Sequence, residues 1–273
     1  MIVWLASYPK SGNTLLRSML ASYLFTEDGV YNFSLIKNIK QFPHGGLFIK
    51  LGIDLKNHNE TIRNYIPAQQ SFNKKDKIQF LKTHSYLFNF NKQFPFTDLN
   101  NTLGAIYIVR DPRNVVTSFS KFLNIPIEET ANFMIKGSGD GLSWTSNWSN
   151  NFNSWKIFEN YKRYLLLKYE DLVNEPESTF LNVLQFIHKL KKIDLKLNEK
   201  KFQNVIESTK FEKMKKLEQD QGFSEAKTNE KTGEKIPFFN LGPKNNWEKL
   251  LESKIQIKLE KAFHNEMKEL GYL

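Results

Sequence analysis

The sequence predicts an α/β protein whose mainly parallel sheet is covered by helices on both faces, a three-layer α/β/α arrangement. Short apolar segments of strand length alternate with segments in which apolar residues recur at helical spacing, as at Leu16, Leu20 and Tyr23. Strands that alternate with helices form parallel sheets buried on both faces. No linker interrupts the 273 residues, so we expect a single domain over residues 1–273.

The first half of the chain contains three predicted strands. Residues 2–7 form an apolar run that ends in a small polar loop, and residues 12–24 form the helix after it. Residues 28–76 follow no long period and are rich in Gly, Pro, Asn and aromatic residues, which is typical of a binding segment. A short strand is expected at 78–82 and a clearer one at 104–109.

The next helix has a strong start signal. Asp111 at the N-cap followed by Pro112 at the first helical position predicts a helix through Phe122. A further strand is expected at 164–169 and a further helix at 175–188.

The remaining segments are expected to close the domain. Residues 219–246 are predicted to form a polar loop and residues 248–270 one closing helix. Aromatic residues at helical spacing usually pack inward, so a core face is favoured over a pocket wall for four of them. These are Trp144, Trp148, Phe152 and Trp155.

Composition limits the classes of function. Hydrophobic residues make up 40% of the chain, with 23 Phe, 10 Tyr and 5 Trp, which indicates a globular protein. The sequence shows neither an apolar run of membrane-spanning length nor a signal-peptide pattern, so we expect a cytoplasmic protein. The chain has no Cys, which excludes disulfides and thiolate metal sites.

The net charge of +10 has two explanations. It arises from 39 Lys and Arg against 29 Asp and Glu, and a basic balance is compatible with nucleic-acid binding. Most of the excess is Lys, however, and a general Lys, Asn and Ile bias produces a basic protein without any basic-patch partner. We expect no nucleic-acid partner, and a nucleic-acid binder remains the third alternative.

The loop after the first strand is built to hold an anion. Lys10 to Thr14 lie where the strand turns into the helix, and unpaired N–H groups at such a turn attract negative charge. Gly12 lets the chain pass close to a ligand, and Lys10 adds a positive charge. A plain helix cap by Ser11 or Asn13 is the alternative.

A second anion site is predicted after the 104–109 strand. Arg110 follows this strand and Ser118 lies eight residues on, in the second turn of the next helix. A guanidinium and a hydroxyl that reach one anion make a phosphate site. An ion pair with Asp111 is the alternative for Arg110. Asp111 also resembles the magnesium-holding acid of an NTPase, but helix capping explains it.

Lys82-Thr83-His84 follows the 78–82 strand at the same edge of the sheet. A histidine there can accept a proton from a hydroxyl nucleophile near neutral pH. A structural or exposed histidine is the alternative. No comparable setting surrounds the other histidines, which are His44, His58, His188 and His264.

Together these motifs resemble the family of sulfotransferases that use 3′-phosphoadenosine 5′-phosphosulfate (PAPS). They occur in the family's order and span almost the whole chain: Lys10-Ser11-Gly12-Asn13-Thr14, Lys82-Thr83-His84, Arg110 with Ser118, and Tyr169-Glu170-Asp171-Leu172. The GxxxxGK[ST] pattern of nucleotide hydrolases is absent. The resemblance implies a P-loop NTPase-like sulfotransferase fold and transfer of a sulfuryl group from PAPS to a hydroxyl or amine acceptor.

The resemblance also implies roles for individual residues. The 3′-phosphate would contact Arg110 and Ser118, Tyr169 would contact adenine, and Thr209 would be another nucleotide contact. The 5′-phosphosulfate would contact Lys10, Ser11, Gly12, Asn13, Thr14 and Leu15.

The implied reaction is an in-line displacement at sulfur. His84 is expected to take the acceptor proton while Lys10, with Lys82, stabilises charge on the leaving phosphate oxygen. A sulfuryl group carries less charge than a phosphoryl group, so we expect no metal.

The C-terminal motif departs from the family pattern. Asn240 and Leu241 stand where the family often has Arg-Lys, whereas Gly242 and Trp247 match. We expect backbone amides around Gly242, with Lys244 or a lysine of the preceding loop, to substitute for the missing cations on the 3′-phosphate.

The acceptor is expected to be a small molecule, a lipid or a sugar with a free hydroxyl. A P-loop kinase or NTPase, or a non-catalytic nucleotide-binding protein on the same fold, is the alternative. A dimer motif that some cytosolic members carry near the C-terminus is not evident, so the sequence predicts no oligomeric state.

Overall fold

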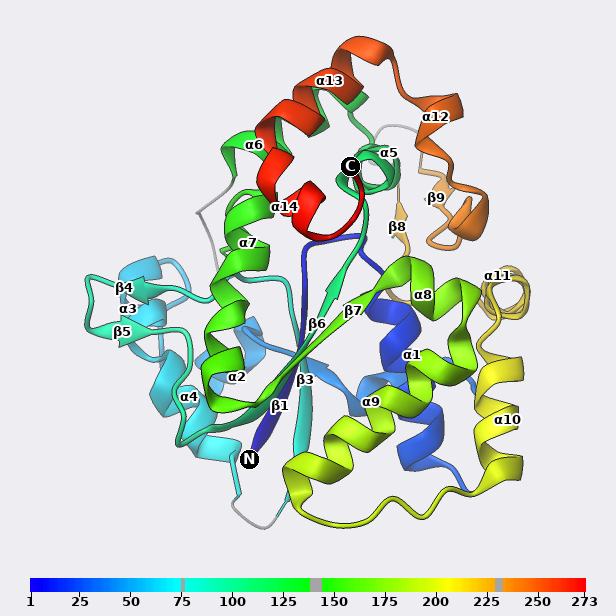
Figure 1. The fold of residues 1–273 in the computed structure, drawn as a ribbon. Helices are drawn as coiled ribbons and strands as arrows, with labels where there is room; N and C mark the ends of the chain where they lie inside the picture. The colour runs from blue at the N-terminus through cyan, green and yellow to red at the C-terminus, as the bar shows by residue number, and fades with distance from the viewer. Residues whose placement is uncertain (75–76, 138–143, 229–232) are drawn as a thin grey trace.

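A five-stranded parallel sheet forms the centre of the computed structural model, which describes residues 1–74, 77–137, 144–228 and 233–273 (Figure 1). Its strand order is β2-β3-β1-β6-β7, and every neighbouring pair is parallel. The predicted parallel sheet is therefore confirmed. The strands are β1 (Ile2–Ser7), β2 (Lys40–Gln41), β3 (Gln79–Thr83), β6 (Thr102–Val109) and β7 (Tyr164–Lys168).

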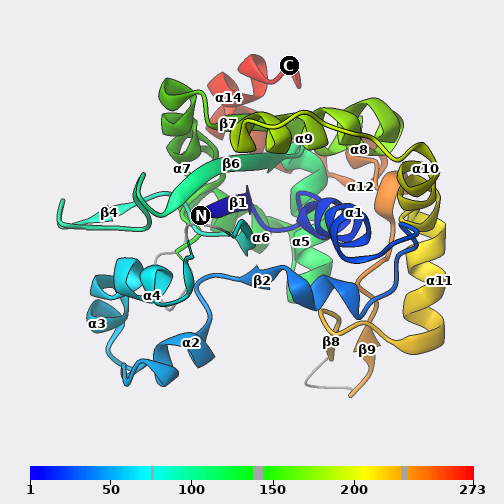
Figure 2. The same cartoon turned by 90° about the horizontal axis from the view of Figure 1, so that it is seen from below.

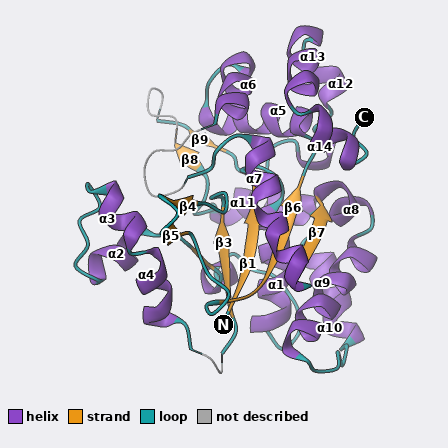
Figure 3. Cartoon of the chain, turned by 60° about the vertical axis from the view of Figure 1, so that its left-hand side comes forward, coloured by secondary structure: helices purple, strands orange, loops and turns teal. Residues whose placement is uncertain are grey.

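Helices cover both faces of the sheet, which confirms the three-layer arrangement (Figure 3). On one face Val3 and Leu5 of β1 pack with α1 (Asn13–Phe25), α9 (Pro176–Lys191) and α10 (Glu199–Ser208). On the other face Trp4 and its neighbours pack with three more helices. These are α7 (Trp148–Trp155), α13 (Ser253–Ala262) and α14 (His264–Glu269).

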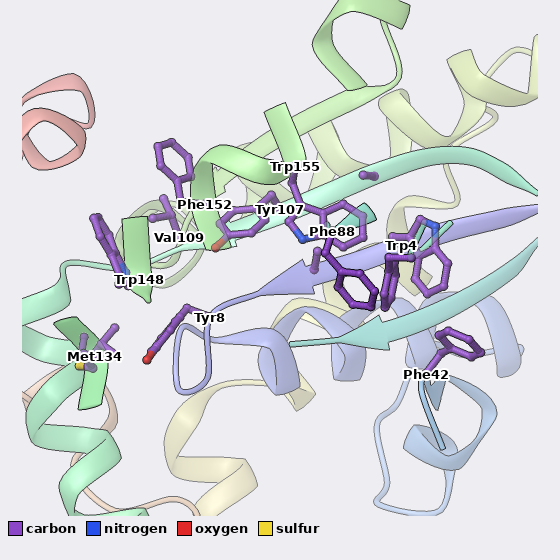
Figure 4. Packing of buried hydrophobic residues seen from close by; sticks show 14 of the residues in the cluster. Trp4, Tyr8, Phe42, Phe88, Tyr107, Val109, Met134, Trp148, Phe152 and Trp155 are labelled. Atoms are coloured by element: carbon purple, nitrogen blue, oxygen red, sulfur yellow. The ribbon is translucent and has the colours of Figure 1, made fainter. Parts of the chain in front are cut away.

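The aromatic stripe belongs to the core, as predicted. Trp148, Phe152 and Trp155 are fully buried on α7, and Figure 4 shows them beside Tyr107 of β6. Trp144 lies before α7, is half-buried, and stacks its ring 5.3 Å from that of Phe88. The stripe therefore packs the fold instead of lining a pocket.

The helix after β6 begins where the sequence predicts. α5 (Pro112–Leu123) has Pro112 at its first position, and the Asp111 carboxylate accepts a hydrogen bond from the Arg113 amide. The Asp111 carboxylate also pairs with the Arg113 guanidinium at 2.7 Å. Capping and this buried ion pair account for Asp111, and Arg110 is left for another partner.

Residues 28–76, in which the sequence shows no long period, form several short elements. This segment contains a 3₁₀ turn, strand β2 and three short helices, which lie together beside the sheet (Figure 2). Phe42, Phe48 and Tyr65 from it are buried in the core. Helices of six to eight residues are too short to show a clear period. The helical elements are η1 (Leu35–Asn38), α2 (Gly45–Lys50), α3 (His58–Arg63) and α4 (Tyr65–Phe72).

The single closing helix is wrong, because the C-terminal segment forms three helices. α12 (Trp247–Leu250) is separated by two residues from α13, which starts at Ser253, and α14 follows Phe263. The predicted 219–246 loop begins inside α11 (Phe211–Gln221) and holds short elements of its own. These are β8 (Lys227–Thr228), β9 (Lys235–Ile236) and η3 (Gly242–Lys244).

The remaining elements connect this framework. They are β4 (Asn89–Phe90), β5 (Phe94–Pro95), α6 (Ile127–Lys136), η2 (Lys156–Tyr161) and α8 (Tyr169–Asn174). No helix among the described residues is both long enough and apolar enough to cross a membrane.

Candidate active site

A cavity of about 640 Å³ lies where the loops after β1, β3 and β6 meet, at the carboxyl ends of the strands. Parallel α/β sheets bind ligands at this edge. The cavity brings together twelve of the residues singled out from the sequence: Lys10, Gly12, Asn13, Thr14, Leu15, Lys82, His84, Arg110, Ser118, Tyr169, Thr209 and Gly242.

Two further predicted residues lie elsewhere. Ser11 is fully buried, and its hydroxyl has no hydrogen-bond partner among the described residues. Lys244 has a side chain that is 82% exposed, with Nζ 3.9 Å from Oε1 of Glu212. Neither residue is among those that line the cavity.

The loop after β1 needs glycine at position 12. Gly12 has a φ of 97°, and a Cβ on it would lie 2.4 Å from Cδ2 of Tyr169. Lys10 also has positive φ, at 64°, a strained conformation for a residue with a side chain. The predicted 164–169 strand is one residue too long, since Tyr169 begins α8. The tyrosine ring therefore packs directly on the loop.

Asn13 ties this loop to the sheet. Its Nδ2 donates to the Leu5 carbonyl at 2.9 Å and to Oγ of Ser7 at 3.2 Å. The side chain does not cap α1, whose N-cap is Gly12. The first amide groups of α1 are thus held toward the cavity, where an anion can bind them.

His84 is held in the tautomer of a base. Its Nδ1 lies 2.9 Å from the carbonyl oxygen of Ser7, which can only accept, so Nδ1 carries the proton. Nε2 therefore keeps a free lone pair. Burial, with the charge of Lys82 second, lowers the pKa of His84 to about 3. The imidazole is therefore neutral at physiological pH.

The backbone around His84 is fixed by α7. Nδ2 of Asn151 donates to the His84 carbonyl at 2.9 Å and to the Thr145 carbonyl at 2.7 Å. Oδ1 of Asn151 accepts from the Tyr107 hydroxyl at 2.7 Å. This buried network connects the histidine to the centre of the sheet.

Two lysines add positive charge to the cavity. Burial, then the nearby Arg110, lowers the pKa of Lys10 to about 8. Burial is also the main reason that the pKa of Lys82 falls to about 8. Nζ of Lys10 lies 4.4 Å from the ring centroid of Phe122 and 4.0 Å from that of Phe238. Lys10 is half-buried and Lys82 is buried, and a bound anion would stabilise the charge of both.

Arg110 is a buried cation with weak partners. Its Nη1 donates to the Lys10 carbonyl at 3.3 Å and Nη2 to the Gly242 carbonyl at 3.5 Å, both long. Nε has no partner among the described residues. The guanidinium stacks 4.2 Å above the Tyr169 ring. A guanidinium so held has donors available for an anion.

At the far end of the cavity an aromatic ring packs against the chain. A Cβ on Gly242 would lie 2.2 Å from Cε2 of Phe211, so glycine allows this aromatic ring to pack against the chain. Thr209 ends α10, and its hydroxyl donates to the Val205 carbonyl at 2.7 Å. Lys210, which the sequence reasoning missed, lines the same end.

Sequence reasoning also missed Arg17 and Glu225. Arg17 Nη1 and Glu225 Oε1 are 2.6 Å apart, and Oε2 of Glu225 accepts from the Thr14 hydroxyl at 3.2 Å. A signal for Arg17 existed, because an arginine within an apolar helix needs a carboxylate partner. No local pattern identifies that partner 208 positions further along the chain.

The described residues contain no group of three or more His, Cys, Asp or Glu side chains that could hold a metal ion.

Comparison with known proteins gives a consistent result. The sequence model of the sulfotransferase domain family matches residues 2–271. Flavonol 3-sulfotransferase of Flaveria bidentis is 24% identical over 282 positions, which cover 98% of this chain and 82% of the plant protein. Amine sulfotransferase of Oryctolagus cuniculus is 26% identical over 177 positions, 62% of this chain and 56% of its own.

Solved structures of this type have the same fold. Retinol dehydratase, in a complex with androsterone and the inactive cofactor PAP, superposes with a TM-score of 0.63 at 18% identity, covering 98% of this chain and 80% of that one. A mouse sulfotransferase with PAP gives a TM-score of 0.57 at 19% identity, covering 97% and 84%. Since the family model spans nearly the whole chain, this protein belongs to the sulfotransferase family, as its sequence predicts.

Proposed function

We propose that this sulfotransferase binds PAPS in the cavity and that His84 serves as the base for its acceptor. One observation carries the proposal: Nε2 of His84 is left unprotonated by the bond from Nδ1 to Ser7, and His84 lines the same cavity as the loop after β1. A base and an anion-binding loop in one cavity fit transfer of an anionic group to a hydroxyl.

The residues at the loop fit a phosphosulfate. Lys10, Gly12 and Thr14 of this loop line the cavity, and Lys10 contributes a positive charge there. The amides from Gly12 to Leu15, together with Lys10, would hold the 5′ end. PAPS supplies a sulfuryl group on a phosphate leaving group.

Side chains of the protein then accept the proton of the acceptor hydroxyl and stabilise the charge on the leaving phosphate. His84 Nε2 accepts the acceptor proton, and the Ser7 carbonyl stabilises the resulting imidazolium through Nδ1. Lys10 and Lys82 face the phosphate oxygen on which charge develops. Because lysines and backbone amides can carry this charge, our proposal includes no metal.

The 3′-phosphate is assigned to Arg110 and Ser118. The long contacts of the Arg110 guanidinium and its partnerless Nε support this assignment. Tyr169 and Thr209 would contact the adenine, with the Phe211 ring beside them. Lys210 lines the cavity at this end, whereas Lys244 lies outside it, so Lys210 is the better substitute for the cations missing at Asn240 and Leu241.

The acceptor is proposed to be a small, largely apolar molecule with a hydroxyl group. Phe119, Phe122 and Phe238 line the cavity that also contains His84. The names of similar proteins, which include a flavonol sulfotransferase and a retinol dehydratase with bound androsterone, support a small acceptor. Lipid or sugar acceptors, a cytoplasmic location and the lack of a nucleic-acid partner stay predictions.

Two measurements test the function. A thermal shift with the desulfated product, 3′-phosphoadenosine 5′-phosphate (PAP), should exceed the shift with ATP and magnesium. Transfer of radiolabelled sulfate from PAPS across a panel of phenols, sterols and sugars should find an acceptor. Stabilisation by ATP and magnesium alone would overturn the proposal in favour of a kinase or NTPase.

A further inference from the structure

A carboxylate of the protein lies in the proposed phosphosulfate cradle. Oε2 of Glu225 accepts from the Thr14 hydroxyl at 3.2 Å. Oε1 lies 2.6 Å from Nη1 of Arg17 and 3.8 Å from Nζ of Lys82. Glu225 also lines the cavity itself. The Glu225 carboxylate therefore contacts three donors. Two of them, Thr14 and Lys82, are assigned to the nucleotide under the proposed function.

Arg17 anchors this carboxylate. Its side chain is 5% exposed, and Nη2 donates to the Ile39 carbonyl at 3.2 Å, which fixes the guanidinium below the cavity. Arg17 lies one turn after Thr14 on α1, so it holds Glu225 above the first turn of that helix. Burial alone would raise the pKa of Glu225, but the charges of Lys82 and then Arg17 outweigh it and lower this pKa, so the carboxylate is ionised.

Two anions cannot share these donors. A phosphate bound to Thr14 and Lys82 would lie against the Glu225 carboxylate, and like charges at contact distance in a cavity repel strongly. We propose that Glu225 is an internal competitor of the nucleotide, which must displace it from Thr14 and Lys82 in order to bind. This proposal rests on the location of the phosphosulfate given under the proposed function.

Displacement of the Glu225 carboxylate would move residues 222–228, which lie next to the proposed acceptor site. Glu225 lies in residues 222–228, between Gly222 with a φ of 71° and strand β8. The ring of Phe223 in this segment packs 5.1 Å from that of Phe238, which in turn covers Nζ of Lys10. Nucleotide binding would thus rearrange Phe238, which lines the same cavity as His84.

The variant Glu225→Gln tests the competition by calorimetry. It keeps the shape of the side chain and removes its charge, so the affinity for PAP should rise about tenfold. Adenosine 3′-monophosphate serves as the second ligand because it lacks the 5′-phosphate. Its affinity should not change, since it does not reach Thr14.

The control variant is Glu129→Gln, which removes the same charge from an exposed position on α6. It should leave the affinities for both ligands unchanged. An unchanged or weaker affinity of the Glu225→Gln variant for PAP overturns the competition. So does an equal gain with adenosine 3′-monophosphate, which would mean a general charge effect. Failure of the unmodified protein to bind PAP would instead refute the proposed function.

Amide hydrogen exchange gives a second readout. PAP should speed exchange in residues 222–228 of the unmodified protein, because the Glu225 anchor is released. In the Glu225→Gln variant exchange should be fast already without the nucleotide. Slower exchange in this segment on PAP binding would show that the carboxylate stays in place, and would overturn the proposal.

Discussion

The two ends of the cavity are built differently. At the end of His84 the functional groups follow strands directly and are fixed by buried hydrogen bonds, as between Asn13 and Leu5 or Asn151 and His84. At the end of Gly242 the wall comes partly from short elements late in the chain. Arg110, although it follows β6 directly, makes only long hydrogen bonds among the described residues. We call the end at His84 the strand-built end and the end at Gly242 the loop-built end. The strand-built end positions groups for a reaction, whereas the loop-built end has room to adapt to its ligand.

The largest effect should follow from removing the base at the strand-built end. His84→Ala should lower kcat by roughly 10² to 10⁴, the usual contribution of a positioned base. PAP affinity should stay within about twofold, because the imidazole does not contact the nucleotide. Steady-state sulfate transfer and calorimetry measure the two effects.

The matched control for this variant is His188→Ala, since His188 lies on α9, where its Nδ1 hydrogen-bonds to the carbonyl of Leu184 on the same helix. It should leave turnover unchanged. Near-normal turnover in His84→Ala would remove the base assignment.

The variant Gly12→Ala tests how rigid the strand-built end of the cavity is. Gly12→Ala places a Cβ 2.4 Å from Tyr169 at a φ of 97°, so the loop and the ring must separate. PAP affinity should fall about a hundredfold, as expected from strain of a few kcal/mol.

Gly52→Ala separates clash from backbone strain. Gly52 has a φ of 75°, and a Cβ there meets no atom within 4 Å. This variant should lose about 1 kcal/mol of unfolding free energy in denaturant titrations and keep its PAP affinity. Equal loss of PAP affinity in both variants would contradict a role for the close contact between Gly12 and the Tyr169 ring.

The loop-built end should depend on a single guanidinium. Arg110→Ala should weaken PAP binding by roughly 10- to 100-fold, the range of a lost charge-assisted hydrogen bond. Binding of adenosine 5′-monophosphate should change much less, because this ligand has no 3′-phosphate. Arg63→Ala, on the distant helix α3, is the control. Similar losses for both nucleotides would place the 3′-phosphate elsewhere.

The smallest expected effect is a pH dependence at the strand-built end. The pKa values of Lys10 and Lys82 are both lowered to about 8, and a bound anion raises them again. Below pH 8 both lysines are protonated with or without PAP. Above pH 8 each must take up a proton on binding, so affinity should fall, by at most about tenfold per pH unit for each lysine.

Calorimetry in buffers of different ionisation enthalpy measures this proton uptake directly. Uptake should appear near pH 8 to 9 and vanish near pH 7, where the 3′-phosphate itself is nearly fully ionised. A pH-independent affinity between 7 and 10 would show that neither lysine contacts the nucleotide.

The sequence predicted the strand-built end well, because its signals are local. A strand, a glycine and a helix start lie within residues 2–24, and Asp111-Pro112 marks the next helix. The parallel sheet then brings these loops to one edge. The catalytic and binding roles themselves stay predictions until they are measured.

The Glu225 contact and the division of the C-terminal segment were beyond sequence reasoning. Arg17 and Glu225 are 208 positions apart, and a contact at that separation is set by the fold alone. The C-terminal helices were predicted as one, because a break at Leu251 and another at Phe263 interrupt the period only briefly. Short elements such as β2 fall below the length at which a pattern is visible.

The network around Asn151 has a practical consequence for altering this protein. It connects His84 to Tyr107 in the centre of the sheet, and none of its bonds involves Phe122 or Phe238. Phe122 and Phe238 thus lie outside the hydrogen bonds that hold His84, although both rings contact Nζ of Lys10. Libraries that vary the two phenylalanines can search for new acceptors while the proton-accepting geometry is inherited intact from the core.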